Sequence, residues 1–353
     1  MKKLLLVGMN SVHTYHFIRL IEGYFDEILL LTNTVNPDYA GKTKTVNFSI
    51  SKPIQLLKTV PSIKNIIHEF QPTIIHIHQA NTAAWLTLQA AGNLKKKTIV
   101  TAWGSDILLH PKRGFFYRKM VEQILASAGY FTADARFLAE SMNALSKKHL
   151  QLAIINFGID PICTTSEELT QVLVKKENII YSNRLHKKLY RIDRIMHAFA
   201  EFVKSQDKTW KMVIAATGEE TGNLQKLAAD LGILEQLIFA GWIGREENKA
   251  WYRAAKIFVS YPESDATSVS LLEAMSAGCI PVLSDLPANK EWVTHEKNGI
   301  ITAQLSAADF EKALPLFNED ILLANLNDML LHATKAHSRK LFFDLYDSVT
   351  AAT

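Results

Sequence analysis

The sequence has few of the features that mark several common classes of protein. Its 353 residues include two cysteines, Cys163 and Cys279, which are too few for a disulfide framework or a cysteine metal cluster. No run approaches the roughly 18 apolar residues of a membrane-spanning helix. The apolar run that ends at Val7 is too short for a signal peptide. We therefore expect a cytoplasmic protein in a reducing compartment.

The usual cofactor motifs are also missing. The expected first strand is followed by Gly8-Met-Asn-Ser-Val-His13, which has one glycine where a dinucleotide fingerprint needs three. There is no phosphate-binding P-loop and no D-x-D carboxylate pair for a metal. His76 and His78 share one face of a strand but have no third ligand at metal spacing, so core or cleft-edge histidines are the favoured interpretation. A nicotinamide enzyme is disfavoured, and we expect neither a cofactor nor a metal.

Charge is present but unevenly spread. Residues 1–160 carry 18 basic and 10 acidic side chains, whereas residues 161–353 carry 21 and 25. A basic first half indicates an anionic partner for that half alone, although a solvated lysine-rich surface explains it equally well. We expect no nucleic-acid partner.

Strand-like and helix-like runs alternate along the chain and restart at Asn178. The pattern predicts an α/β fold with two doubly wound parallel sheets, each Rossmann-like, that face a cleft. The expected domains are 1–160, which would bind an acceptor, and 161–335, which would bind a donor. A helix at 336–353 would pack back on the first domain. Ligands bind at the carboxyl ends of the strands in such sheets.

The most informative segment is Asp265–Met275, between the expected strands Ile257–Pro262 and Ile280–Ser284. One carboxylate, Asp265, lies in a loop of small polar residues, and a second, Glu273, lies one to two turns into a helix. The start of a helix presents free N–H groups to an anion. Acids beside such a helix end suit hydroxyl groups that flank a phosphate, as in a nucleotide sugar.

Three loops supply further candidates. Asn183–Asp193 brings four cations to the end of a strand, where arginine can bind a diphosphate bidentately; a solvated basic loop is the alternative. Asn10–His16 is rich in hydrogen-bonding groups at a helix start, although Ser11 also suits a plain helix cap. The loop from Trp103 to Asp106 is either a plain turn or a substrate-facing loop.

The segment Lys112–Lys119 interleaves aromatic and basic residues in the basic half. It could lie on an anionic membrane surface. We slightly favour the alternative, in which Phe115 and Phe116 pack into the core.

These motifs together resemble the GT-B superfamily of retaining, nucleotide-sugar-dependent glycosyltransferases of the "group 1" type. Asp265 to Glu273, followed by Ala-Met-Ser-Ala-Gly278-Cys-Ile-Pro281-Val, resembles that family's E-x7-E block. Asn183-Arg184-Leu185 resembles its G-R-L, and Asn156–Asp160 resembles its N-G-V-D. The sequence departs from the family in having Asp265 for the first glutamate, Tyr190-Arg191 for a Lys-Gly pair and Trp103 for a histidine.

The resemblance implies a role for each matched residue. Glu273 would hold the donor ribose, Asp265 the donor sugar, and Arg184 the diphosphate. The residues implied as catalytic are Asp265, Glu273, Arg184 and Asp106. Those implied as donor-binding are Arg184, Lys188, Arg191, Gly241, Thr267, Ser268, Val269, Ser270 and Glu273. Those implied on the acceptor side are Asn10, Ser11, His13 and Trp103.

The resemblance implies transfer of a sugar from a nucleoside diphosphate sugar to a hydroxyl, with retention. The acceptor would be a saccharide or a lipid-linked saccharide in cell-envelope glycan synthesis. We expect a cytoplasmic enzyme with weak contact to the inner face of the cytoplasmic membrane through its first domain. A sugar-nucleotide epimerase of the same shape and a non-catalytic sugar-nucleotide-binding protein remain alternatives.

Overall fold

The structure is a computed structural model that describes residues 1–50, 53–206 and 209–351. The chain divides into two compact units. Unit 1 comprises Met1–Phe157 and Lys335–Thr353, and unit 2 comprises Gly158–Thr334. Within the described residues, no helix is both long enough and apolar enough to cross a membrane.

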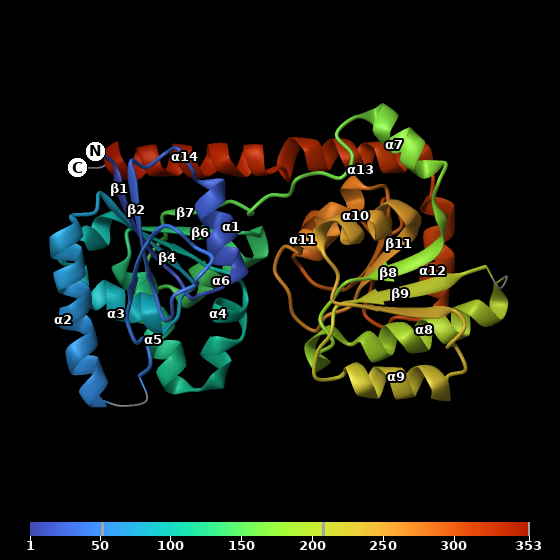
Figure 1. Ribbon diagram of the computed structural model, residues 1–353, viewed down its shortest axis with the longest axis horizontal. Coiled ribbons are helices and arrows are strands. Elements are labelled where there is room, and N and C mark those ends of the chain that lie inside the picture. Colours follow the sequence, from blue (N-terminus) through green and yellow to red (C-terminus); the bar gives the residue numbers. More distant parts are fainter. Residues whose placement is uncertain (51–52, 207–208, 352–353) are drawn as a thin grey trace. The chain divides into compact units, whose positions relative to one another are not determined.

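Unit 1 contains a parallel sheet of seven strands in the order β3-β2-β1-β4-β5-β6-β7 (Figure 1). The strands are β1 Lys3–Val7, β2 Glu27–Thr32, β3 Lys42–Thr45, β4 Ile74–His78, β5 Thr98–Thr101, β6 Tyr130–Ala133 and β7 Leu152–Ile154. The helices are α1 Val12–Leu20, α2 Pro53–Phe70, α3 Thr82–Ala90, α4 Ser105–Leu108, α5 Phe115–Ser127 and α6 Arg136–Leu145. The central strands β1 and β4 are buried throughout except at Lys3, as expected when helices cover both faces of a sheet.

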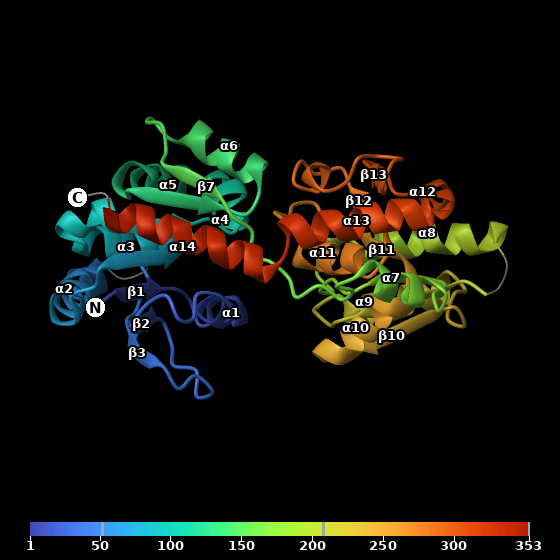
Figure 2. The same cartoon turned by 90° about the horizontal axis from the view of Figure 1, so that it is seen from above.

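The C-terminal helix α14, Lys335–Ala351, packs on unit 1. Figures 1 and 2 both show it running along the sheet of this unit. Phe342, Tyr346 and Val349 are fully buried in the same apolar cluster as the strands β1 and β4. The Tyr346 hydroxyl lies 2.8 Å from Nδ1 of His76, so a buried hydrogen bond also fixes the register of the helix.

Unit 2 contains a parallel sheet of six strands in the order β10-β9-β8-β11-β12-β13. The strands are β8 Glu177–Ser182, β9 Lys211–Ala215, β10 Leu237–Gly241, β11 Ala255–Ser260, β12 Ile280–Ser284 and β13 Ile300–Thr302. The helices are α7 Ser166–Leu173, α8 Ile192–Ser205, α9 Thr221–Asp230, α10 Arg245–Ala254, α11 Val269–Ser276, α12 Ala307–Ala313 and α13 Glu319–His332. The expectation of two parallel-sheet α/β domains is confirmed.

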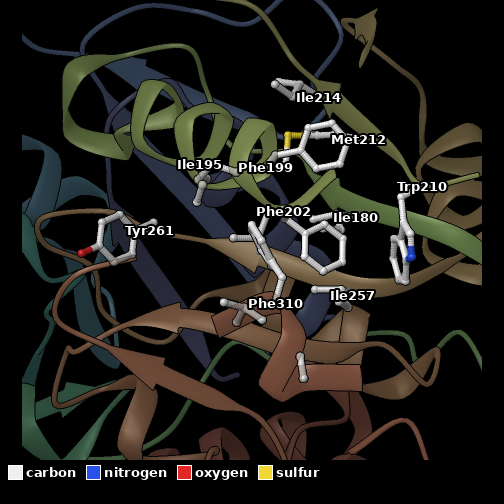
Figure 3. Close-up of a cluster of buried hydrophobic side chains, with 14 of the residues drawn as sticks. Ile180, Ile195, Phe199, Phe202, Trp210, Met212, Ile214, Ile257, Tyr261 and Phe310 are labelled. Atoms are coloured by element: carbon white, nitrogen blue, oxygen red, sulfur yellow. The ribbon is translucent and has the colours of Figure 1, made fainter. Parts of the chain in front are cut away.

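One face of this second sheet is covered by the apolar side of α8. Phe199 and Phe202 are fully buried there, against Met212 of β9 and Ile257 of β11 (Figure 3). Burial of each such side chain stabilises the fold by about 1.5–3 kcal/mol. The core therefore fixes the strands whose carboxyl ends carry the candidate site.

Several elements differ from the sequence-based expectation. The run Ile154–Phe157 predicts the last strand of the first half, but β7 ends at Ile154. The strand β3 was not expected because its sequence, Lys-Thr-Lys-Thr, is that of a solvated edge strand with no apolar alternation. A proline can split a helix, but α2 continues through Pro61.

Candidate active site

Three residues meet where strands β8 and β11 end and helix α11 begins. Arg184 lies two residues after β8, Asp265 lies in the loop after β11, and Ser268 is the residue that precedes the first turn of α11. Arg184 Nη2 donates to Asp265 Oδ2 at 2.6 Å, and its Nη1 donates to Ser268 Oγ at 2.7 Å. The structure thus brings together three residues that the sequence predicted for one site.

The ion pair is largely shielded from solvent. The Arg184 side chain is 11% exposed and that of Asp265 is 25% exposed. Burial raises the pKa of Asp265, while the Arg184 charge and the Ala266 amide oppose that shift. The carboxylate is therefore held in place by its partners in surroundings that favour its neutral form.

Glu273 lies further along α11, and its charge acts on two tyrosines of a buried polar network. The Tyr181 hydroxyl donates to Asn248 Oδ1 at 2.6 Å, and Asn183 Nδ2 donates to that oxygen at 3.1 Å and to the Tyr252 hydroxyl at 2.8 Å. Burial and, secondly, the Glu273 carboxylate raise the pKa of both tyrosines. The charge of Glu273 therefore lies close to these phenols, at the end of the sheet.

The remaining residues predicted in this segment lie just before α11 or in its first turn. Thr267 and Ser270 are half-buried, and the Val269 side chain is 42% exposed. The first amides of a helix have no acceptor within the helix, and their partial positive charge favours an anion. The first turn of α11 can thus add backbone donors beside Arg184.

Two of the predicted cations lie elsewhere. Arg191 donates through Nε to the Tyr261 carbonyl at 2.9 Å and through Nη2 to the Pro262 carbonyl at 2.8 Å. Lys188 lines a groove of about 630 Å³ between α8 and α9, and neither Arg184 nor Asp265 lines it. Arg191 thus holds the segment that follows β11, and its expected role on the diphosphate stays a prediction.

Gly241 ends β10 with a φ of +68°, and no atom lies within 4 Å of the position that a Cβ would take there. The next residue, Trp242, has 76% of its surface exposed. Trp242 was not among the residues predicted from the sequence, although its exposed ring lies at the carboxyl end of a strand. A large apolar residue directly after a strand-ending glycine is the signal that could have found it.

Gly218 lies in the loop after β9. A Cβ at this position would come within 2.4 Å of the His186 carbonyl oxygen, so only glycine allows the two loops to approach so closely. The Thr221 hydroxyl, 2.9 Å from Nδ1 of His186 and 2.9 Å from the Gly218 amide, joins them. The sequence analysis did not single out either residue, although both support the loop that carries Arg184.

In unit 1, Asp106 is fully buried. Its Oδ2 accepts from the Ala80 amide at 2.7 Å and its Oδ1 from the Trp103 amide at 3.0 Å. The carboxylate therefore joins the loop after β4 to the loop after β5. Both carboxylate oxygens of Asp106 thus have backbone partners, and its expected role in catalysis stays a prediction.

Other residues predicted on the acceptor side also hold loops together. Ser11 Oγ accepts from the Thr14 amide at 3.3 Å and caps α1. The Asn10 side chain accepts from the Tyr15 hydroxyl at 2.8 Å and donates to the Thr34 hydroxyl at 3.1 Å. Both remain partly exposed, so contact with an acceptor stays a prediction.

The aromatic rings of His13, Trp103 and His78 are in contact, edge-to-face between His13 and Trp103 and tilted between Trp103 and His78. Centroid distances are 5.4 Å from His13 to Trp103 and 5.2 Å from Trp103 to His78. Burial lowers the pKa of His78 to about 3 and also lowers that of His13. Among the described residues, neither ring nitrogen of His78 has a hydrogen-bond partner. Trp103 and His13 thus lie together beside a neutral histidine, and their contact with an acceptor stays a prediction.

At the start of α5, Phe115 is 77% exposed, Phe116 is 50% exposed and Tyr117 is 37% exposed. Lys112 and Arg113 beside them are also exposed. These five residues are called the aromatic-basic patch below. The slightly favoured expectation, that both phenylalanines pack into the core, is wrong.

In the part of the chain that the structure describes, no three His, Cys, Asp or Glu side chains are grouped so that they could hold a metal ion. Independence from a metal and from other cofactors stays a prediction.

Comparison with known families matches both units. Residues 166–329 match the family described as Glycosyl transferases group 1, and residues 2–135 match the family described as Glycosyl transferase 4-like.

Individual relatives match over shorter stretches. The alpha-monoglucosyldiacylglycerol synthase of Streptococcus pneumoniae is 33% identical over 93 residues, which are 26% of this chain and 21% of that protein. The GDP-mannose:cellobiosyl-diphosphopolyprenol alpha-mannosyltransferase of Xanthomonas oryzae is 27% identical over 124 residues, which are 34% of this chain and 33% of that protein. The chain thus spans about a fifth to a third of the length of these relatives.

Solved structures match over the full length. Anabaena HepE, solved in complex with UDP and glucose, has a TM-score of 0.78 at 12% identity, covering 99% of this chain and 100% of that one. At this identity the likeness shows the fold alone. The two family matches thus identify a glycosyl transferase 4-like domain in unit 1 and a group 1 glycosyl transferase domain in unit 2.

Proposed function

We propose that this protein transfers a sugar from a nucleoside diphosphate sugar to a hydroxyl acceptor, with retention of anomeric configuration. The observation that carries the proposal is the contact of Arg184 with Asp265 and Ser268 at the start of α11, which also holds Glu273. A cation, free helix amides and two carboxylates at one sheet edge match the mixed chemistry of a nucleotide sugar. Such a ligand presents phosphate and hydroxyl groups side by side.

In this proposal the diphosphate lies against Arg184 and the first amides of α11. Negative charge grows on the diphosphate as the bond to the sugar breaks, and fixed donors in a shielded site stabilise that charge. A guanidinium and backbone amides can supply this stabilisation without a metal. Glu273 would accept hydrogen bonds from the ribose hydroxyls.

Asp265 would bind the hydroxyls of the donor sugar. The Asp265 side chain is one methylene shorter than the glutamate of the resembling family. The position of its carboxylate would therefore set the position of the sugar and the choice of donor. No side chain is proposed as a nucleophile, and retention would follow from attack on the face that the leaving phosphate occupies.

We propose that the nucleobase lies beside Gly241, in the open space where a Cβ would stand. The exposed Trp242 ring next to it can stack on a base. Stacking tolerates every base because each has a π-face, so this contact adds affinity without selecting one nucleotide.

We further propose a lipid-linked acceptor, met at the inner face of an anionic membrane in cell-envelope glycan synthesis. Exposed rings beside exposed cations, as in the aromatic-basic patch, suit insertion at the headgroup level of such a surface. The names of both relatives also include a lipid, a diacylglycerol in one and a diphosphopolyprenol in the other.

The reaction is tested with a panel of nucleoside diphosphate sugars and saccharide or lipid-linked acceptors, with products identified by mass spectrometry. A glycosylated acceptor together with free nucleoside diphosphate is the expected result. Conversion of the donor with no acceptor present would point to an epimerase. Binding of nucleotide sugars without turnover would favour a non-catalytic protein. Full activity with EDTA present is expected, since no step needs a metal.

The membrane contact is tested by sedimentation with liposomes that contain phosphatidylserine. The double variant Phe115→Ser/Phe116→Ser should bind several-fold less than the native protein, because ring insertion is lost. Leu57→Ser is the matched control, since Leu57 on α2 is also 77% exposed in unit 1 but lies outside the aromatic-basic patch. Equal binding by the native protein and the double variant would rule out this contact.

A further inference from the structure

The ring of Tyr190 lies under the guanidinium of Arg184. The Arg184 Cζ atom is 4.5 Å from the ring centroid, which is within the distance for a cation–π contact. The guanidinium thus has its edge on Asp265 and Ser268 and its face on an aromatic ring. Sequence spacing places Tyr190 where the resembling family has a lysine.

The cations that could replace that lysine are directed elsewhere. Both Arg191 hydrogen bonds go to the carbonyls of Tyr261 and Pro262. Lys187 and Lys188 are exposed and line the groove between α8 and α9. Arg184 is therefore the cation that this structure places against Asp265, and an aromatic ring occupies the place of a second cation.

The ring is fixed by the fold. Lys188–Tyr190 form a short 3-10 turn, which the Tyr190 amide closes by donating to the Lys187 carbonyl at 2.9 Å. Arg191 then turns the chain into α8 with a φ of +47°. Tyr190 is half-buried and packs against the apolar core of unit 2, so it forms a rigid surface at the edge of that core.

We infer that Tyr190 is a positioning residue that keeps Arg184 aimed at the donor diphosphate. The inference rests on the proposed function. In that function Asp265 turns to the donor sugar, and Arg184 loses its ion-pair partner just when it must bind phosphate. A ring on the face of the guanidinium fixes its plane and leaves the in-plane N–H groups free for phosphate oxygens. The site thus obtains its phosphate affinity from one oriented guanidinium.

The test compares binding of UDP and GDP with binding of uridine and guanosine, by calorimetry on the full chain. Tyr190→Leu should weaken binding of the preferred diphosphate by about three- to tenfold, the range of a partly shielded cation–π contact. Binding of the nucleoside should not change, because it has no phosphate for Arg184 to hold. Tyr190→Phe should retain native affinity for the diphosphate, since the ring remains.

Two further variants separate the inference from an effect on stability. Tyr190→Met keeps an apolar side chain of similar length and lacks the ring, so it should lose diphosphate affinity like Tyr190→Leu even where Leu impairs folding. Phe317→Leu removes the ring under Lys256, where Nζ is 5.5 Å from the centroid, and should leave diphosphate affinity unchanged.

The outcomes are distinct. A native protein that binds a diphosphate, with Tyr190→Leu and Tyr190→Met binding it equally well, overturns the inference alone. Equal losses for nucleoside and diphosphate also overturn it, since they would show a general disturbance of the site. A native protein that binds neither diphosphate and turns over no nucleotide sugar overturns the proposed function together with the inference.

Discussion

The carboxyl edges of the two sheets both gather polar side chains, but these side chains make different kinds of contact. In unit 1, Asp106, Ser11 and Asn10 spend their hydrogen bonds on nearby backbone and side-chain groups. In unit 2, Arg184 and Asp265 contact each other in a partly exposed ion pair, and the first turn of α11 lies beside them. The polar groups of unit 1 thus hold loops together, whereas those of unit 2 are placed where they can form hydrogen bonds with a ligand.

The difference has a physical basis. A short polar residue just after a strand readily bonds neighbouring backbone, which makes it a turn or cap residue. An arginine has several donors on a long side chain, so it can keep one contact and offer others. A position at a strand end therefore predicts that a residue lies near a candidate site. The length of its side chain and its number of donors determine whether it can also bind a ligand.

The largest expected effect breaks the unit 2 side of this comparison. Arg184→Gln removes the guanidinium, and loss of one fixed donor to a developing negative charge lowers kcat by about 100- to 1,000-fold. Steady-state turnover with the preferred donor measures the loss. Arg194→Gln is the matched control, because Arg194 on α8 is exposed and contacts Asp193 at 3.8 Å. Similar turnover in the two variants would refute the assignment of Arg184 to the active site.

The next effect separates a structural carboxylate from a functional one. Asp106→Ala leaves two backbone amides without their acceptor, which should lower the free energy of unfolding by about 2–4 kcal/mol.

The two carboxylates of unit 2 should affect function instead. Glu273→Ala should chiefly weaken nucleotide binding, and Asp265→Ala should reduce transfer more than nucleotide affinity. Urea unfolding and calorimetry on all three variants measure both quantities. Unchanged nucleotide affinity in Glu273→Ala would refute its assignment to the ribose.

The contrast between the units also shows what sequence reasoning could reach. The buried strands were predicted from their apolar runs, and the placement of Arg184 and Asp265 in one site from the position of each residue at a strand end. Both predictions rest on local pattern and parallel topology, which place strand ends at one edge.

The contact of Asp106 with Ala80 depends on two loops that are distant in sequence. Such a long-range contact has no local signal. The exposure of Phe115 and Phe116 was mispredicted for the same reason, because composition alone does not tell which face of α5 meets the core.

The third effect is a loss of stability at acidic pH, which the buried histidines of unit 1 cause. The pKa of His78 is lowered to about 3 by burial, and that of His76 is also lowered well below its usual value. Between about pH 6.5 and 3, the unfolded chain therefore binds more protons than the folded one, so stability falls as pH falls. The loss for His78 is about 1.4 kcal/mol per pH unit within that window.

The measurement is urea unfolding at pH 7.5 and pH 5.0. His78→Phe should lose less stability between these values than the native protein, by about 2 kcal/mol. The variant keeps an aromatic ring beside Phe17 and Trp103, whose centroids lie 4.4 Å and 5.2 Å from that of His78. An identical acid loss in both proteins would show that His78 does not contribute to it.

The smallest expected effect concerns Trp242, and it tests whether unit 2 also uses a contact without charge. Stacking on a nucleobase contributes about 1–3 kcal/mol, and the lower end is expected because the ring is 76% exposed. Trp242→Ala should weaken binding of every nucleoside in a panel by about fivefold, since 1 kcal/mol at this scale is a factor of about 5. Trp242→Phe should recover most of that loss. Leu234→Ala is the control, because Leu234 is another exposed apolar residue of unit 2, at 58%. A loss confined to one base would instead show that Trp242 selects the nucleotide, and unit 2 would then read its donor through an uncharged side chain as well as through Arg184.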